Sequence, residues 1–220
     1  MNTLLSLFRS LAGDLVDLVA PVTCAACGEA FPARFPLCEV CSHHLAPPDE
    51  APEGVFVAYD HGGPLARAIH RAKYGDDPAV AAALGVLLAD AWEAHEEGAF
   101  DVVVPVPLHA ARLRTRGFNQ SAELSRALAQ RLGAVVGFDA AWRVRDTPTQ
   151  TKLDREARRA NVRDAFLASA SLRGKRVLLV DDVVTTGSTL DALRDACEEA
   201  GAVTVRATAL ARAPLFFSAQ

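Results

Sequence analysis

The sequence predicts an α/β fold, in which a parallel sheet is flanked by helices, with a small N-terminal zinc-binding module. Two apolar runs without alternation, within residues 101–108 and 177–180, indicate strands that are covered on both faces, as in a parallel sheet. Stretches between them repeat their apolar residues at helical spacing. Two Cys-x-x-Cys pairs near the N-terminus indicate the metal site.

The composition suits one domain of ordinary size with a small appendage. The chain has 220 residues, of which 50% are hydrophobic and 23% are charged, so it is not disordered in bulk. The net charge of -4 argues against a surface that is uniformly coated by nucleic acid. Residues 112–176, however, hold 15 of the 23 Lys and Arg and only 6 of the 27 Asp and Glu. This segment is expected to meet anions, either a pyrophosphate-bearing sugar or a single-stranded nucleic acid.

Residues 1–20 favour an amphipathic helix that packs on the body of the protein or on a partner. Their apolar residues recur at helical spacing from Leu4 to Val19, and Asp14 and Asp17 interrupt the run that a signal peptide would need. Nowhere in the sequence do about 18 apolar residues follow one another, as a membrane span would require.

Four of the five cysteines predict a structural Zn²⁺ site. They form two knuckles, Cys24 with Cys27 and Cys38 with Cys41, separated by ten residues. A gap of two residues lets both thiolates of a knuckle reach one metal ion, and the second knuckle completes a tetrahedral shell. Two disulfides or a redox pair are the alternatives, but the sequence has neither a secretory signal nor a βαβ pattern around the cysteines.

Three further residues could be confused with ligands. His43 and His44 follow the second knuckle closely enough to replace one of its cysteines, although a surface position is the simpler interpretation. The fifth cysteine, Cys197, lies on the apolar stripe of a predicted helix and is expected in the core.

A proline-rich linker over residues 46–54 separates two predicted domains. We assign the N-terminal helix and the zinc module to residues 1–50 and the sheet domain to residues 51–220. The elements expected in the second domain are a strand over 55–59, helices over 64–73 and 78–95, a strand over 101–108, a helix over 121–132, a strand over 177–180, a helix that closes at Gly201 and a strand over 202–210. The predicted buried faces are Leu65, Ile69 and Ala72 in the first helix and Val80, Leu84, Leu87, Leu88, Ala91 and Trp92 in the second.

The strand over residues 101–108 ends in a stiff turn that is followed by a basic cluster. The turn reads Pro105-Val106-Pro107-Leu108, and its prolines stop the strand from pairing further because they lack an N–H donor. Such a turn can fix backbone amides toward a ligand. The basic cluster comprises Arg112, Arg114 and Arg116. These arginines suit an anion, and the start of a solvated helix is the alternative.

Residues 142–166 form the least regular part of the sequence. They are polar and dense in arginine, and they lack apolar periodicity. This pattern predicts a mobile loop over a site rather than core. Closure of such a loop would exclude water from a reactive centre.

The candidate chemistry lies in residues 177–189. Asp181 and Asp182 follow the apolar run, and after two valines comes the turn Thr185-Thr186-Gly187-Ser188-Thr189, which opens a helix. A phosphate fits this turn, because backbone N–H groups converge at a helix N-terminus and the helix dipole favours an anion there. The acidic pair can accept hydrogen bonds from ribose hydroxyls and help to hold hydrated Mg²⁺. The alternative is a capped helix with two solvated aspartates.

This stretch resembles the phosphoribosyl pyrophosphate (PRPP) binding signature of the type I phosphoribosyltransferases, in which a hydrophobic run, two acids and two hydrophobics precede Thr-Thr-Gly-Ser-Thr. The resemblance implies their fold, a Rossmann-like parallel sheet flanked by helices. It implies that the turn from Thr185 to Thr189 cradles a 5'-phosphate and that Asp181 and Asp182 bind the ribose hydroxyls. The turn from Pro105 to Leu108, with Arg112 and Arg116, would hold the pyrophosphate that enters with Mg²⁺.

A longer series of motifs resembles the ComF family, which comprises phosphoribosyltransferase-like proteins required for DNA uptake in naturally competent bacteria. The motifs are the paired Cys-x-x-Cys, Lys73 before Tyr74-Gly75, Val-Pro-Val-Pro-Leu at 104–108, Arg-Gly-Phe-Asn-Gln at 116–120, Thr149-Gln150, Arg158 through Asn161, Ala165-Phe166 and residues 179–189. The family implies a zinc-bearing N-terminal module, a cytoplasmic location and a role in internalising single-stranded DNA alongside a helicase-like motor.

Two hypotheses for function follow from the resemblance. In the first, the protein is a Mg²⁺-dependent phosphoribosyltransferase of unnamed acceptor, with Asp181, Asp182 and Arg116 as its catalytic residues. In the second, it is a non-catalytic PRPP sensor or an adaptor that binds single-stranded DNA or a motor protein. Three aromatic residues within or beside the basic segment could stack on bases, namely Phe118, Trp142 and Phe166.

Overall fold

The computed structural model describes residues 23–31, 36–75, 77–96, 98–145 and 165–214. The predicted N-terminal helix within residues 1–20 lies outside these ranges, and so do residues 146–164 of the predicted loop.

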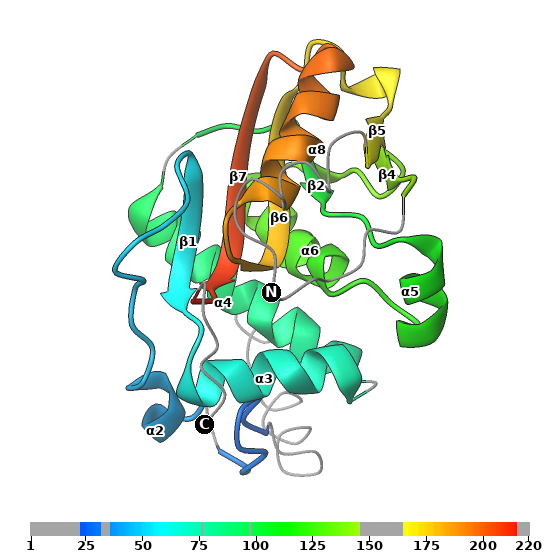
Figure 1. The fold of residues 1–220 in the computed structure, drawn as a ribbon. Coiled ribbons are helices and arrows are strands. Elements are labelled where there is room, and N and C mark those ends of the chain that lie inside the picture. The colour runs from blue at the N-terminus through cyan, green and yellow to red at the C-terminus, as the bar shows by residue number, and fades with distance from the viewer. Residues whose placement is uncertain (1–22, 32–35, 76, 97, 146–164, 215–220) are drawn as a thin grey trace, which may run out of the picture.

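A five-stranded parallel sheet forms the centre of the described part of the chain (Figure 1). The strand order is β1-β7-β6-β2-β3, and every neighbouring pair runs parallel. The strands are β1 (Val55–Asp60), β2 (Val102–Pro105), β3 (Val135–Val136), β6 (Arg176–Val184) and β7 (Thr204–Arg212). The predicted α/β class is therefore confirmed.

The central strand β6 is covered on both faces, as its unbroken apolar run predicts. Leu178 and Val180 belong to one core cluster and Val177 and Leu179 to another, and all four side chains are fully buried. The strand is longer than predicted and includes both aspartates, because β7 pairs with it as far as Val184. The acidic pair is therefore held by the sheet itself and does not lie in a loop after it.

Helices cover the two faces of this sheet. Residues of α3 (Gly63–Tyr74), α4 (Pro78–His95) and α6 (Gln120–Leu132) join the cluster of Leu178, whereas α8 (Ser188–Glu199) joins the cluster of Val177. Every residue predicted for the buried faces of the first two helices is buried, from Leu65 to Trp92. Cys197 is fully buried on α8, as expected.

Several short elements are not predicted by the sequence pattern. These are α2 (Glu39–Ser42), α5 (Ala110–Arg116), β3, a 3-10 turn (Ala170–Leu172) and the antiparallel pair β4 (Ala141–Arg143) and β5 (Phe166–Ala168). The pair β4–β5 corrects the irregular interpretation of the ends of residues 142–166, since Trp142 pairs with Leu167 and Arg143 with Phe166. Elements of two to seven residues are too short to show a period.

A glycine sets the close packing of α4 on α6. A Cβ atom added at Gly85 would lie 3.0 Å from the Cα of Leu124 and 3.1 Å from the carbonyl oxygen of Glu123. Both contacts are to the backbone of α6, so no side-chain rotation can relieve them. The distance between the two helices thus depends on the missing side chain.

We expect Gly85→Ala to lower the free energy of unfolding by about 1–2 kcal/mol, because over-packing outweighs the gain of about 1 kcal/mol in helix propensity. Urea unfolding monitored by circular dichroism measures the change. Ala82→Gly, at an exposed position of the same helix, is the matched control and should also destabilise, by about 1 kcal/mol. A more stable Gly85→Ala protein would contradict the packing argument.

Candidate functional site

The acidic pair on β6 is held by contacts from two helices. The Oδ1 atom of Asp181 accepts hydrogen bonds from the hydroxyl of Ser121 on α6, at 3.1 Å, and from the backbone amide of Asp182, at 2.9 Å. The Oδ2 atom of Asp182 lies 2.8 Å from Nζ of Lys73, at the end of α3. Three segments far apart in the sequence therefore meet at this point.

The electrostatics of the pair follow from burial and from mutual charge. Burial, and then the negative charge of Asp182, raise the pKa of Asp181 to about 7. Burial on its own would lower the pKa of Lys73, but the charge of Asp182, their hydrogen bond and the charge of Asp181 outweigh it and raise that pKa. Lys73 is therefore a charged ammonium group next to the pair.

The small-residue turn lies between the end of β6 and the start of α8. Gly187 is the N-cap residue with φ +82°, in the left-handed region that favours glycine, and helix α8 begins at Ser188. The hydroxyls of Thr186 and Ser188 are 2.8 Å apart. The first amides of a helix have no partner within the helix, so this turn presents donors suited to an anion.

The turn after β2 is held by β6 and by Asn119, which both hydrogen-bond to the backbone of Val106. The amide of Val106 donates to the carbonyl oxygen of Val180 at 2.9 Å, and the carbonyl of Val106 accepts from the side-chain amide of Asn119 at 3.0 Å. Pro105 and Val106 are buried, whereas Pro107 and Leu108 are half-buried. The amide of Val106 is thus already used within the sheet.

The structure brings one arginine of the basic cluster to the end of α3. Arg116 donates to Oε1 of Gln120 at 3.1 Å, and its guanidinium carbon lies 5.5 Å from the ring centre of Tyr74. Its positive charge also acts on Lys73. Arg112 is half-buried on α5 and Arg114 is exposed there.

Sequence reasoning gave no role to Lys73 or Ser121. Lys73 belongs to one of the motifs that resemble the ComF family, but nothing in that motif relates it to Asp182, and a serine at the start of a helix has many possible roles. Only the packing of α3 and α6 against the same strand end brings these side chains to the aspartates.

The four cysteines of the N-terminal module form a cluster that can hold a metal ion. Their Sγ atoms all lie within 4.8 Å of one another, and those of Cys27 and Cys38 are 3.8 Å apart. A tetrahedral ion with metal–sulfur distances of about 2.3 Å places its sulfur ligands about 3.8 Å apart. None of the four forms a disulfide in the structure, and the clustering of all four sulfur atoms favours the metal site over the disulfide alternative. His43 and His44 are exposed and outside the cluster.

The pKa values of Cys24 and Cys41 are shifted in opposite directions. Burial would raise the pKa of Cys24, but hydrogen bonds from the backbone of Cys27, Cys38 and Ala26 outweigh it, and the pKa falls to about 6. Burial, and then the neighbouring thiols, raise the pKa of Cys41 to about 12. A cation would stabilise all the thiolates together, so the donor set fits a metal ion.

Helix α3 fastens this cluster to the sheet domain. Arg71 donates to the carbonyl oxygens of Cys24 and Ala25 at 3.1 Å and 3.0 Å. The side chains of Cys24, Leu37 and other residues of the module also share one core cluster with Leu65 and neighbouring residues of α3. The residues on either side of the linker are therefore packed together.

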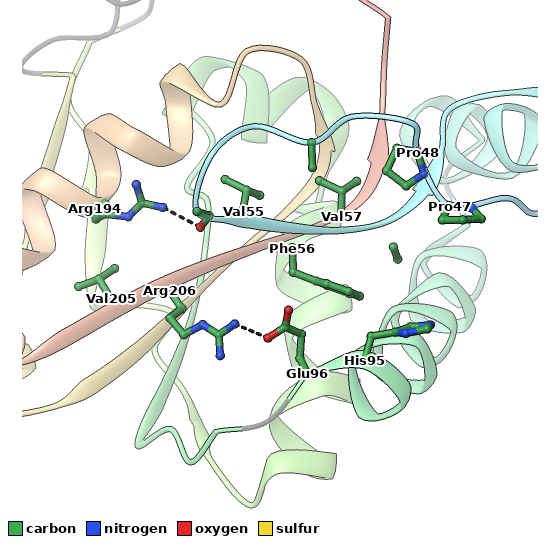
Figure 2. Close-up of a pocket in the computed structure, with 13 residues that line it drawn as sticks. Pro47, Pro48, Val55, Phe56, Val57, His95, Glu96, Arg194, Val205 and Arg206 are labelled. Atoms are coloured by element: carbon green, nitrogen blue, oxygen red, sulfur yellow. Dashed lines mark hydrogen bonds and ion pairs between the residues drawn. The ribbon is translucent and has the colours of Figure 1, made fainter.

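An open pocket of about 670 Å³ lies at the other end of the sheet (Figure 2). It is lined by the edge strand β1, by Val205 and Arg206 near the start of β7, and by the end of α4, where Arg206 forms an ion pair with Glu96. None of the predicted site residues lines it.

Comparison with known proteins gives the class of fold. The family model described as a phosphoribosyl transferase domain matches residues 70–214, which include the acidic pair and the turn after it. None of the described helices is long and apolar enough to cross a membrane.

Individual relatives narrow this class. The DNA utilization protein YhgH of Salmonella typhimurium is 33% identical over 203 residues, covering 86% of this chain and 89% of its own. Competence protein F of Haemophilus influenzae is 34% identical over 157 residues, covering 68% of this chain and 69% of its own. The solved glutamine PRPP amidotransferase of B. subtilis is 24% identical with a TM-score of 0.41, over 59% of this chain and a quarter (25%) of its own. The chain belongs to the ComF family of phosphoribosyltransferase-domain proteins.

We expect Arg71→Gln to weaken metal binding and to destabilise the protein, because two carbonyl groups of the first knuckle lose their donor. The affinity for Zn²⁺, measured by competition with a chromophoric chelator, should fall about tenfold, and the free energy of unfolding by about 1–3 kcal/mol. Arg67→Gln is the matched control, since Arg67 is exposed on the same helix. Equal metal affinities of the two variants would show that Arg71 does not support the knuckle.

Proposed function

We propose that this protein binds PRPP together with Mg²⁺ at the end of β6 and supports the uptake of single-stranded DNA in natural competence. The observation that carries the proposal is that the half-buried acidic pair at the end of β6 is followed closely along the chain by the left-handed turn at Gly187, where α8 begins. A ribose 5-phosphate group fits this arrangement, because its phosphate can bind at the turn while its ribose hydroxyls donate hydrogen bonds to the two carboxylates.

The roles of the residues follow from this placement. The turn from Thr185 to Thr189 would bind the 5'-phosphate, and Asp181 and Asp182 would accept hydrogen bonds from the ribose hydroxyls. The half-buried part of the turn after Pro105, namely Pro107 and Leu108, would face the pyrophosphate together with the arginines of α5. These arginines are Arg112 and Arg116, and they would neutralise its charge.

Two metal ions belong to the proposal. Zn²⁺ in the four-cysteine cluster would be structural, because a closed shell of four thiolates leaves no position for a substrate. Carboxylate oxygens are ligands that Mg²⁺ prefers, so the acidic pair also fits that ion. Mg²⁺ bound with PRPP would neutralise the charge that develops on the leaving pyrophosphate.

Transfer chemistry at this site would need no covalent nucleophile from the protein. As the bond from C1 of the ribose to pyrophosphate breaks, a nitrogen acceptor forms the new bond at C1. The chain would contribute orientation through Asp182 and charge stabilisation through Arg116. A panel of nitrogen bases assayed for pyrophosphate release tests whether turnover occurs, since only an enzyme consumes PRPP in step with an acceptor.

A second candidate function is a non-catalytic PRPP sensor or an adaptor for single-stranded DNA or a helicase-like motor. The observation that favours it is Trp142, which is 46% exposed on β4 within the basic segment, where a base could stack on its ring. The names of the relatives, a DNA utilization protein and a competence protein, agree with either candidate. Affinity for single-stranded DNA that falls steeply with salt and falls again in Trp142→Ala would support the adaptor.

Calorimetric titration with PRPP and Mg²⁺ tests PRPP binding, which the transferase and the PRPP sensor share and which the adaptor does not require. We expect Gly187→Ala to weaken PRPP binding by about tenfold or more, because an L-residue at φ +82° is strained and its Cβ would lie 2.9 Å from the Cβ of Pro52, displacing the donors of the turn.

Gly133→Ala is the matched control for this prediction. Gly133 also has a positive φ, +63°, but a Cβ there meets nothing within 4 Å. The control therefore introduces similar backbone strain but leaves the turn at Gly187 undisturbed. Its PRPP affinity should equal that of the wild type. Absence of binding heat in the wild-type protein would overturn the proposed function.

A further inference from the structure

Lys73 occupies the position at the acidic pair where a metal ion would be expected. Its Nζ atom is 2.8 Å from Oδ2 of Asp182, and the two side chains are only 21% and 15% exposed. An ion pair that is largely shielded from water is not the loosely held contact of a protein surface. It is a fixed part of the site in the absence of ligand.

The two aspartates differ in what holds them. Asp181 accepts neutral hydrogen bonds, from the hydroxyl of Ser121 and from the amide of Asp182, whereas Asp182 has an ammonium group as its partner. The pair therefore already includes one positive charge, and Arg116 adds a second charge near Lys73.

We propose that Lys73 is the resident cation of the acidic pair, which positions Asp182 and keeps a free divalent ion out until the anionic ligand brings its own. The PRPP part of this inference rests on the proposed function. The exclusion of free metal rests only on the contact between Lys73 and Asp182.

The physical reason is competition for one carboxylate. A divalent ion that approaches Asp182 must displace the ammonium group or lie beside it, and like charges a few ångströms apart repel strongly in a site with little water. Mg²⁺ also gives up its water reluctantly. A ligand that carries several negative charges removes both obstacles, because its oxygens can take over the ammonium group on its flexible stem.

The order of binding follows from this competition. The ligand-free protein should not bind the metal at the acidic pair, and the metal should enter as its complex with the phosphorylated ligand. Lys73 thus acts on the ribose through Asp182, as a positioning residue.

The experiment measures Mn²⁺ alone, by the electron paramagnetic resonance signal of the free ion, with the cysteine cluster loaded with Zn²⁺ and no PRPP present. We expect Lys73→Met to bind Mn²⁺ at least about tenfold more tightly than the wild type, since one positive charge is removed from the carboxylates. Lys73→Arg keeps the charge and should behave as the wild type. Adding Asp182→Asn to Lys73→Met should abolish the gained binding.

Two results would overturn the inference. One is a folded Lys73→Met protein, checked by circular dichroism, that binds Mn²⁺ no better than the wild type. The other is a wild-type protein that itself binds Mn²⁺ tightly and loses this binding in Asp182→Asn, a measurement that needs no folded Lys73 variant. If Lys73→Met does not fold, Lys73→Gln replaces it in the first comparison.

The Mn²⁺ experiment can succeed or fail independently of the test of PRPP binding. The Mn²⁺ measurement contains no PRPP, so a protein that fails to bind PRPP can still bind Mn²⁺ more tightly when Lys73 is replaced by Met. Conversely, PRPP binding with unchanged Mn²⁺ affinity in Lys73→Met would retain the proposed function and remove the role given to Lys73.

Discussion

Strand β6 must bury four apolar side chains on its two faces and then, within the same strand, hold two carboxylates close together. Neither requirement can be met without neighbours: β7 pairs along the strand to its end, and Lys73 and Ser121 reach the acidic pair from two different helices. Two carboxylates in a poorly hydrated position would repel each other and lose their hydration. The positions of α3 and α6 are therefore tied to the charge at the end of this strand.

The sequence predicts a large share of this architecture, for reasons that can be traced to particular residues. The run from Val177 to Val180 has no polar interruption, which only a strand covered on both faces tolerates, and α4 shows its buried face in the spacing from Val80 to Trp92. The two Cys-x-x-Cys knuckles predict the four-cysteine cluster equally clearly, because the geometry of a metal site restricts the spacing of its ligands. Patterns of this kind depend only on residues within one helix, one strand or one metal-binding motif, so they can be recognised in the sequence.

What the sequence does not predict are contacts between elements. Lys73 and Asp182 lie 109 positions apart, and no periodicity relates the end of one helix to the end of a distant strand. The short elements α5, β4 and β5 are not predicted for a different reason, since three to seven residues contain too little of a period to recognise. The sequence pattern predicts too early an end for β6 because aspartate is uncommon in strands, and pairing with β7 outweighs that preference.

Helix α3 also has a geometrical role that follows from the positions of two of its residues. Arg71 contacts the cysteine module and Lys73 contacts the acidic pair, and residues two positions apart leave a helix about 200° apart around its axis. The helix thus lies between the two centres and contacts each of them through a different face. An insertion of a single residue between Arg71 and Lys73 would rotate one of them by about 100° relative to the other. The angle between these two residues around the axis of α3 therefore links the cysteine module to the acidic pair.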